Sequence, residues 1–243
     1  MQEFETFVYL DVQKTGSTFI TNLLQRFSSE KEIRFKKHAA TGNKYDPGKF
    51  HFISVRDPRD QYISLYSHGC GGNGALYRRL RRLGHQDLYD STWQGFKRWL
   101  KFVLRLENAE LLDDDYGGPD AGSINALIGF QSYRFIELAM RDPVETIQAC
   151  KNRNDLLDAY NEKKIVNFVV RNESLVEDME KLLTTQLRNS ISDLDGALKF
   201  LNEGHRLNAS DRIDRFEDNP DLGPKNTRTL EEREWFLHEL FGY

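Results

Sequence analysis

Short apolar runs bounded by polar residues recur along the chain and predict buried strands. Residues 7–12, 50–55 and 165–170 are rich in β-branched and aromatic side chains, and 32–35 is a shorter candidate. A strand that is apolar over its whole length is typical of a sheet with both faces covered. The pattern therefore predicts several buried strands distributed from one end of the chain to the other.

Segments with helical periodicity follow these runs. In 19–27 the apolar residues fall on one helical face: Phe19, Ile20, Leu23, Leu24 and Phe27. After 50–55, Asp57 is suited to accept hydrogen bonds from the first amides of a helix over about 58–68, and Pro58 suits its first position. Strands joined through helices pair in parallel, so we expect an α/β fold with a parallel sheet covered on both faces by helices.

The middle of the chain, about 75–160, is predicted to be mainly helical. It contains one apolar stripe with helical spacing, which indicates core packing: Trp93, Phe96, Leu100 and Val103. The acidic, glycine-rich stretch 113–122 predicts an exposed loop. Thr229 and Glu232 have the spacing of a capping box and predict the start of a last helix through Leu240. We expect a single domain over 1–243, with 75–160 as a helical elaboration.

Composition excludes several classes of protein. With 243 residues, 39% of them hydrophobic, the chain is long enough to bury a core, and a net charge of −4 argues against a dedicated nucleic-acid binder. Two cysteines cannot build a disulfide framework or a four-thiolate zinc site. The first residues lack a basic secretory signal, and no apolar run is long enough to span a membrane. We therefore expect a soluble, cytoplasmic protein.

The loop after the first strand has the chemistry of a phosphate site. It comprises Gln13–Thr18 and precedes a helix, so free amides and the positive end of the helix dipole face an anion there. Lys14 adds a cation, Gly16 permits a close turn, and hydroxyls come from Thr15, Ser17 and Thr18. A Walker A loop has a longer glycine-rich turn with lysine after the second glycine, whereas here lysine precedes the only glycine. An ordinary polar turn is the alternative.

The end of the third strand offers a second anion site. Arg56 stands at the strand end, and Ser64 follows eight residues later, about two turns into the next helix. A guanidinium and a hydroxyl in this arrangement are suited to a second, separate phosphate. The alternative is that Arg56 pairs with Asp60. In parallel sheets, ligands bind beyond the carboxyl ends of the strands, where both loops are expected to lie.

Together these two segments resemble the family of sulfotransferases that depend on 3′-phosphoadenosine-5′-phosphosulfate (PAPS), and best its bacterial and carbohydrate-type branch. Lys14–Thr18 resembles the family's 5′-phosphosulfate loop, and Arg56 with Ser64 resembles its 3′-phosphate site. Weaker similarities extend over most of the chain, at residues 37–41, 170–178 and 241–243. The resemblance implies a P-loop-type sheet, PAPS as the cofactor, no metal, and an acceptor hydroxyl that receives the sulfuryl group.

The resemblance also implies catalytic roles. Lys14 is expected to neutralise charge on the bridging oxygen, and His38 is expected to be the base, because its stretch resembles the family's catalytic-histidine segment. His51 is expected to be packed inside its strand, and His68 is the reserve candidate. Two residues depart from the family pattern: Gln13 stands where proline is usual, and Asp11 where a histidine or an uncharged residue is usual. For Asp11 we expect a bond to Lys14 or to a backbone amide.

The acceptor is not fixed by the sequence. The 75–160 elaboration is expected on the acceptor side, and a glycan or a small molecule are both open. Four arginines in Arg78–Arg82 suit either an acidic glycan or a solvated helix face. We expect neither nucleic acid nor membrane as a partner. Two other functions remain as alternatives: a P-loop small-molecule kinase, and a non-catalytic nucleotide-binding protein.

Overall fold

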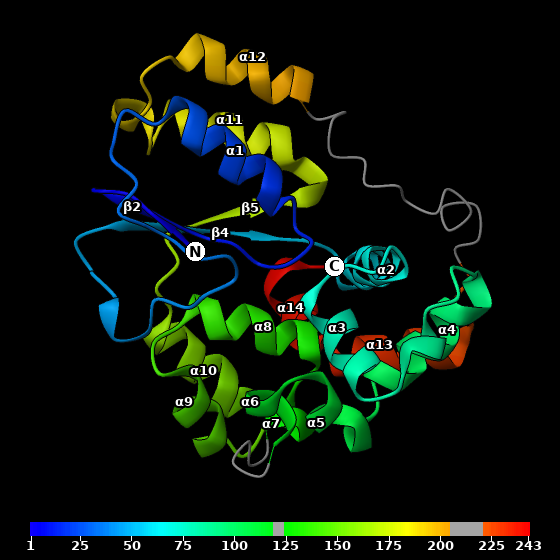
Figure 1. The fold of residues 1–243 in the computed structure, drawn as a ribbon. Helices are drawn as coiled ribbons and strands as arrows, with labels where there is room; N and C mark the ends of the chain where they lie inside the picture. Colours follow the sequence, from blue (N-terminus) through cyan, green and yellow to red (C-terminus); the bar gives the residue numbers. More distant parts are fainter. Residues whose placement is uncertain (119–123, 205–220) are drawn as a thin grey trace. The chain divides into compact units, whose positions relative to one another are not determined.

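The computed structural model describes residues 1–118, 124–204 and 221–243, and these form two compact units. The unit that we call the sheet unit comprises Met1–Arg56, Glu137–Arg141 and Lys163–Ala209. The other, the helical unit, comprises Asp57–Ile136, Asp142–Glu162 and Ser210–Tyr243. Figure 1 shows the elements of both units.

A five-stranded sheet forms the centre of the sheet unit, with strand order β3-β1-β2-β4-β5. The strands are β1 (Gln2–Glu3), β2 (Phe7–Leu10), β3 (Arg34–Phe35), β4 (Phe50–Val55) and β5 (Phe168–Arg171). Strands β2 and β4 and the edge strand β5 are parallel to one another. Tyr9 of β2 lies opposite Phe52 of β4, and Ile53 of β4 lies opposite Val169 of β5. The predicted strands are thus present in an α/β fold with a parallel core.

The strand β1 departs from the expected parallel sheet. It pairs antiparallel with both β2 and β3 and was not predicted, because two residues are too few to show a pattern. Only three residues separate β1 from β2, and such a short connection permits an antiparallel pair but not a parallel crossover. The sheet is therefore mixed, with β1 running against the other four strands.

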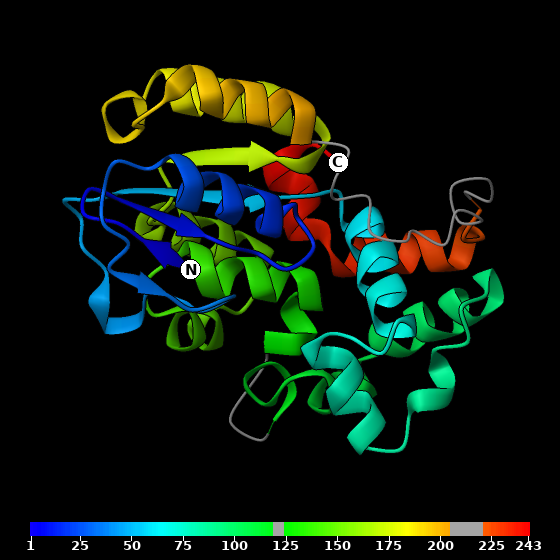
Figure 2. The same ribbon diagram turned by 45° about the horizontal axis from the view of Figure 1, so that its top comes forward.

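Three helices cover one face of this sheet: α1 (Ser17–Phe27), α11 (Leu175–Thr184) and α12 (Leu194–Gly204). Figures 1 and 2 show them on the same side of β2, β4 and β5. The predicted apolar face of α1 is buried, and Phe19 stacks on Phe200 of α12 with ring centroids 5.4 Å apart. Burial of this face against the sheet holds the N-terminus of α1 at the carboxyl end of β2.

The helical unit confirms the helical prediction for the middle of the chain. It contains α2 (Pro58–Cys70), α3 (Ala75–Arg82), α4 (Trp93–Val103), α5 (Ala109–Leu112), α6 (Asp114–Gly117), α7 (Ile124–Leu127), α8 (Phe130–Ala139, whose last residues belong to the sheet unit), α9 (Pro143–Ala149), α10 (Arg153–Lys163), α13 (Pro224–Arg233) and α14 (Trp235–Phe241). Short 3₁₀ helices of the two units are Gly42–Lys44, Gln86–Leu88, Leu106–Asn108, Asn172–Ser174 and Arg188–Ser190. No helix in the described ranges is both long and apolar enough to cross a membrane.

A buried carboxylate organises the interior of the helical unit. Glu234 is fully buried between α13 and α14 and accepts hydrogen bonds from the Ser132 amide at 2.8 Å and hydroxyl at 2.7 Å, from the Gln131 amide at 3.2 Å, and from the Tyr62 hydroxyl at 2.5 Å. The two amides belong to the first turn of α8, whose N–H groups have no partner within the helix. Glu234 therefore joins α2, α8 and α14.

Two local expectations in this unit are wrong. Residues 114–117 form the helix α6 instead of an exposed loop, because Tyr116 is buried and its hydroxyl donates to the Ile128 carbonyl at 3.1 Å; residues 119–123 of that predicted loop lie outside the described residues. Thr229 does not begin a helix. It lies inside α13 and its hydroxyl donates to the Lys225 carbonyl.

Candidate functional site

The loop between β2 and α1 turns sharply at two residues with left-handed backbone. Lys14 has φ of 63° and Gly16, the N-cap of α1, has φ of 88°. The amides of Phe19 and Ile20 donate to the Gly16 carbonyl, which starts the helix and leaves the earlier amides of its first turn directed out of the helix end. The predicted strand-loop-helix arrangement is present, with the helix dipole directed at the loop.

Gly16 is required by space as well as by its backbone angle. A Cβ at this position would lie 2.7 Å from Leu175 Cδ1 and 3.0 Å from Asn172 Nδ2. Both neighbours belong to the segment that leads from β5 into α11. The absence of a side chain thus lets the start of α1 approach the loop after β5.

The hydroxyls of this loop face in different directions. Thr15 is fully buried, and its hydroxyl donates to the Val12 carbonyl at 2.8 Å and bonds Ser54 Oγ at 2.6 Å. That hydroxyl therefore ties the loop to β4, so a contact of Thr15 with a ligand would have to come from its backbone. Ser17 is buried at the first position of α1, and Thr18 is exposed.

Positive charge is concentrated at the carboxyl ends of β2 and β4. Burial lowers the pKa of Lys14, and the nearby charges of Arg56 and Lys37 lower it further. Like charges that perturb one another in this way repel, and a bound anion relieves the repulsion. Arg56 directly follows Val55, the last residue of β4, as the sequence predicts.

His38 lies beside Asp11 in the same unit. The backbone amide of His38 donates to Asp11 Oδ1 at 2.9 Å, and its Nδ1 lies 2.8 Å from the Asp11 carbonyl oxygen and 3.3 Å from Oδ2. The Asp11 side chain is fully buried, whereas the His38 side chain is 27% exposed. Asp11 thus bonds a backbone amide, one of the two outcomes expected for it, and that amide belongs to His38.

Other polar groups meet the same carboxylate. The nitrogen of Met1 lies 2.5 Å from Asp11 Oδ1 and also donates to the backbone carbonyls of Lys36 and Ala39. Because β1 pairs with both β2 and β3, these contacts hold the segment that carries His38 against the end of β2.

Residues 1–116 match the model of the sulfotransferase family. The matched part contains the Lys14 loop, His38, Arg56 and Ser64, which is the region where the two phosphate motifs first indicated the resemblance. No curated protein and no solved structure matches the chain.

The remaining predicted residues of the matched region are divided between the two units. Ser64 is buried in α2 of the helical unit, whereas Arg56 belongs to the sheet unit, so their joint phosphate site stays a prediction. His51 is buried in β4 as expected and its Nδ1 donates to the Lys49 carbonyl; burial lowers the pKa of this histidine. His68 is exposed in the last turn of α2.

One arginine of the cluster Arg78–Arg82 makes hydrogen bonds within the helical unit, and the other three are exposed to solvent. Arg79 donates to the carbonyls of Leu111 and Glu110 and to the Asp114 carboxylate at 2.6 Å, which joins α3 to α5 and α6. The other three arginines, Arg78, Arg81 and Arg82, are exposed. Among the described residues no group of three or more His, Cys, Asp or Glu side chains is placed to hold a metal ion.

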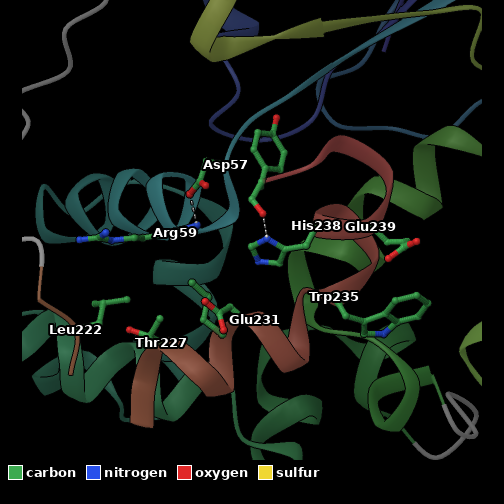
Figure 3. Close-up of a pocket in the computed structure, with 10 residues that line it drawn as sticks. Asp57, Arg59, Leu222, Thr227, Glu231, Trp235, His238 and Glu239 are labelled. Carbon is green, nitrogen blue, oxygen red and sulfur yellow. Dashed lines mark hydrogen bonds between the residues drawn. The ribbon is translucent and has the colours of Figure 1, made fainter. Parts of the chain in front are cut away.

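The helical unit contains a cavity of ≈ 550 Å³ that the sequence did not reveal. Figure 3 shows residues of α13, α14 and the start of α2 around it: Asp57, Arg59, Leu222, Thr227, Leu230, Glu231, Trp235, His238, Glu239 and Tyr243. His238 Nδ1 donates to the Tyr243 carbonyl at 2.9 Å. The spacing of three and four between Thr227, Leu230, Glu231 and Trp235 was the available sequence signal. None of the lining residues lies in 75–160, the part expected on the acceptor side.

Proposed function

We propose that the chain transfers the sulfuryl group of PAPS to an acceptor hydroxyl by in-line transfer, with His38 as the base. The observation that carries this proposal is the concentration of positive charge beside the N-terminus of α1: Lys14 and Arg56 follow the parallel strands β2 and β4, and Lys37, after β3, is close enough to act on Lys14. This arrangement is suited to a phosphate, and the family match of the same residues supports a sulfotransferase.

Two sets of residues are our candidates for the two phosphates of the cofactor. The first amides of α1, with Ser17 and Thr18, are our candidates to hold the 5′-phosphate, and Arg56 with Ser64 to hold the 3′-phosphate. PAPS supplies an activated sulfuryl group whose leaving group is a phosphate. When PAPS gives up this group, the electron pair of the broken bond would stay on the bridging oxygen, and Lys14 is our candidate to neutralise that charge.

The acceptor oxygen forms the new bond to sulfur and loses its proton. His38 would take that proton at Nε2, since its Nδ1 is engaged with Asp11. A carbohydrate hydroxyl is our first choice of acceptor, because the sequence resembles the carbohydrate-type branch of the family. The proton, the electron pair and the transferred group are then all accounted for without a metal.

The cofactor class is tested by thermal unfolding with adenosine 3′,5′-bisphosphate, ATP or ADP, each with and without magnesium. We expect stabilisation by the bisphosphate without magnesium, of about 2.7 kcal/mol at 100 times its dissociation constant. Equal or greater stabilisation by ATP that requires magnesium would overturn the proposal in favour of a kinase. Transfer of labelled sulfate from PAPS to a panel of sugars, phenols and alcohols separates an enzyme from a non-catalytic binding protein.

Two substitutions test the assigned roles. Arg56→Ala should weaken binding of the bisphosphate, whereas Lys14→Ala should lower turnover more than it lowers that affinity, because its best contact forms in the transition state. Lys31→Ala, an exposed lysine of the same unit, is the control and should change neither quantity. A Lys14→Ala variant with reduced affinity but full turnover would contradict the role given to Lys14.

A further inference from the structure

Asp11, a buried acidic residue at the end of β2, contacts His38 through its backbone carbonyl and both of its carboxylate oxygens. It follows β2 directly, while His38 comes 27 residues later in the segment after β3. Oδ1 accepts from the His38 amide, the backbone carbonyl bonds the ring at Nδ1, and Oδ2 lies 3.3 Å from the same ring nitrogen. A single residue thus contacts both the backbone and the imidazole of His38.

The contact at Nδ1 decides which ring nitrogen carries the proton. A carbonyl oxygen can only accept, so the 2.8 Å bond to the Asp11 carbonyl requires a proton on Nδ1. In the neutral ring, the lone pair is then at Nε2. This is the tautomer that a general base needs when the acceptor approaches from the Nε2 side.

The contact at the backbone amide stabilises a strained conformation. His38 has φ of 56°, in the left-handed region that residues with a Cβ avoid at a cost of about 1–2 kcal/mol. The hydrogen bond from its amide to Asp11 Oδ1 offsets part of this cost. Strain of this kind persists only where surrounding contacts hold it, and it is frequent at functional sites.

We propose that Asp11 is a positioning residue for His38: its backbone carbonyl fixes the proton on Nδ1, and its carboxylate holds the His38 backbone in place and stabilises the imidazolium that forms when Nε2 takes the acceptor's proton. This inference rests on the proposed function, in which His38 is the base. An acidic residue that orients a histidine in this way is a general device of proton transfer. This role would explain why an aspartate stands at position 11, where the resembling family usually has a histidine or an uncharged residue.

The first experiment uses the unmodified protein. Its histidine rings are labelled with ¹⁵N, the His38 signals are identified by their loss in His38→Asn, and long-range ¹H–¹⁵N spectra show which nitrogen is protonated. Asparagine is chosen because it tolerates the left-handed backbone better than most residues. We expect the proton of His38 on Nδ1; a proton on Nε2 in the neutral ring would overturn the inference.

Two variants then separate the contacts. Asp11→Asn keeps an acceptor for the His38 amide but removes the charge, and Asp11→Ala removes both. We expect turnover to fall about 10-fold in the first and about 100-fold in the second, with unchanged affinity for adenosine 3′,5′-bisphosphate and with the proton of His38 still on Nδ1, because both variants keep the backbone carbonyl of residue 11. The loss is smaller than the ~10⁴-fold known where the carboxylate alone orients the base, because a backbone carbonyl also bonds the ring here.

Glu3→Gln is the matched control. Glu3 is also a partly buried carboxylate of the sheet unit, paired with Arg34 and Lys49, so its substitution removes a similar charge without touching His38. We expect it to leave turnover and tautomer unchanged; a loss equal to that of Asp11→Asn would reduce the effect of Asp11 to general destabilisation and overturn the inference.

The outcomes also separate this inference from the proposed function. If His38→Asn keeps full turnover, the proposed base is wrong and Asp11 has no catalytic use. If His38→Asn loses turnover while both Asp11 variants keep turnover, the base stands and only the role of Asp11 is wrong.

Discussion

Substitution of Gly16 by alanine combines two physical costs at the start of α1. The first is backbone strain, because φ at this position is 88° and an L-residue pays about 1–2 kcal/mol in the left-handed region. The second is crowding, because the new Cβ would lie 2.7 Å from Leu175 Cδ1 and 3.0 Å from Asn172 Nδ2. Overpacking of this kind costs about 1–3 kcal/mol. The free energy of unfolding of the sheet unit should therefore fall by about 2–5 kcal/mol.

Gly42 offers a matched control in the same unit. Its φ is 53°, and a Cβ there would have no heavy atom within 4 Å. Gly42→Ala therefore carries the strain without the crowding and should cost only about 1–2 kcal/mol. The difference between the two variants isolates the close approach of α1 to the segment after β5.

Hydrogen exchange measured by mass spectrometry is the appropriate assay, because peptides from β2 and α1 report on the sheet unit alone. All three tryptophans, Trp93, Trp99 and Trp235, belong to the helical unit, so their fluorescence during urea unfolding serves as an internal reference. A shift of α1 should also displace its first amides and weaken binding of adenosine 3′,5′-bisphosphate in Gly16→Ala. Equal losses of stability in the two variants would refute the crowding argument.

Three further predictions concern buried and titrating groups. Glu234→Gln should lower the free energy of unfolding of the helical unit by about 3 kcal/mol, followed by tryptophan fluorescence, because the new amide donor faces the donors of Ser132. The exposed Glu231→Gln is its control and should change little. Burial lowers the pKa of His51 below 6.5, so as the pH falls the unfolded chain takes up a proton before the folded protein does. Protection of the sheet unit from hydrogen exchange should therefore decrease as the pH drops below about 6.5 and through the lowered pKa. In His51→Asn this decrease should be less steep. Calorimetry should show affinity for adenosine 3′,5′-bisphosphate falling as the pH rises through the lowered pKa of Lys14, since only the ammonium form attracts the anion, and Lys14→Met should remove this dependence.

The local elements were predictable because their signals are local. The apolar runs at β2 and β4 and the amphipathic face of α1 can be read from neighbouring residues alone, and they fix where the two polar loops begin. The cap of α2 is equally local: Asp57 Oδ1 accepts from the amides of Arg59 and Asp60, as expected from the sequence. Because these elements set where the strands end, the sequence also predicted the positions of the candidate residues in the loop after β2 and of Arg56 after β4.

Contacts between distant segments were decided only by the tertiary structure. The strand β1 exists because its neighbours β2 and β3 supply hydrogen bonds on both sides, and two residues carry no periodicity that would predict it. Likewise, the inward direction of the Thr15 hydroxyl depends on the position of Ser54 in β4, and the helix α6 depends on the burial of Tyr116.

The same division holds at the candidate site. The sequence determined that a lysine, a glycine and an arginine stand at strand ends, because strand ends are set by local hydrophobic pattern. It left open the partner of Asp11 and the proton of His38, since these depend on which strands pair and on how the segment after β3 returns to the end of β2. Hydrogen bonds between residues far apart in the chain leave no periodic trace in the sequence, and only the folded arrangement brings their atoms together.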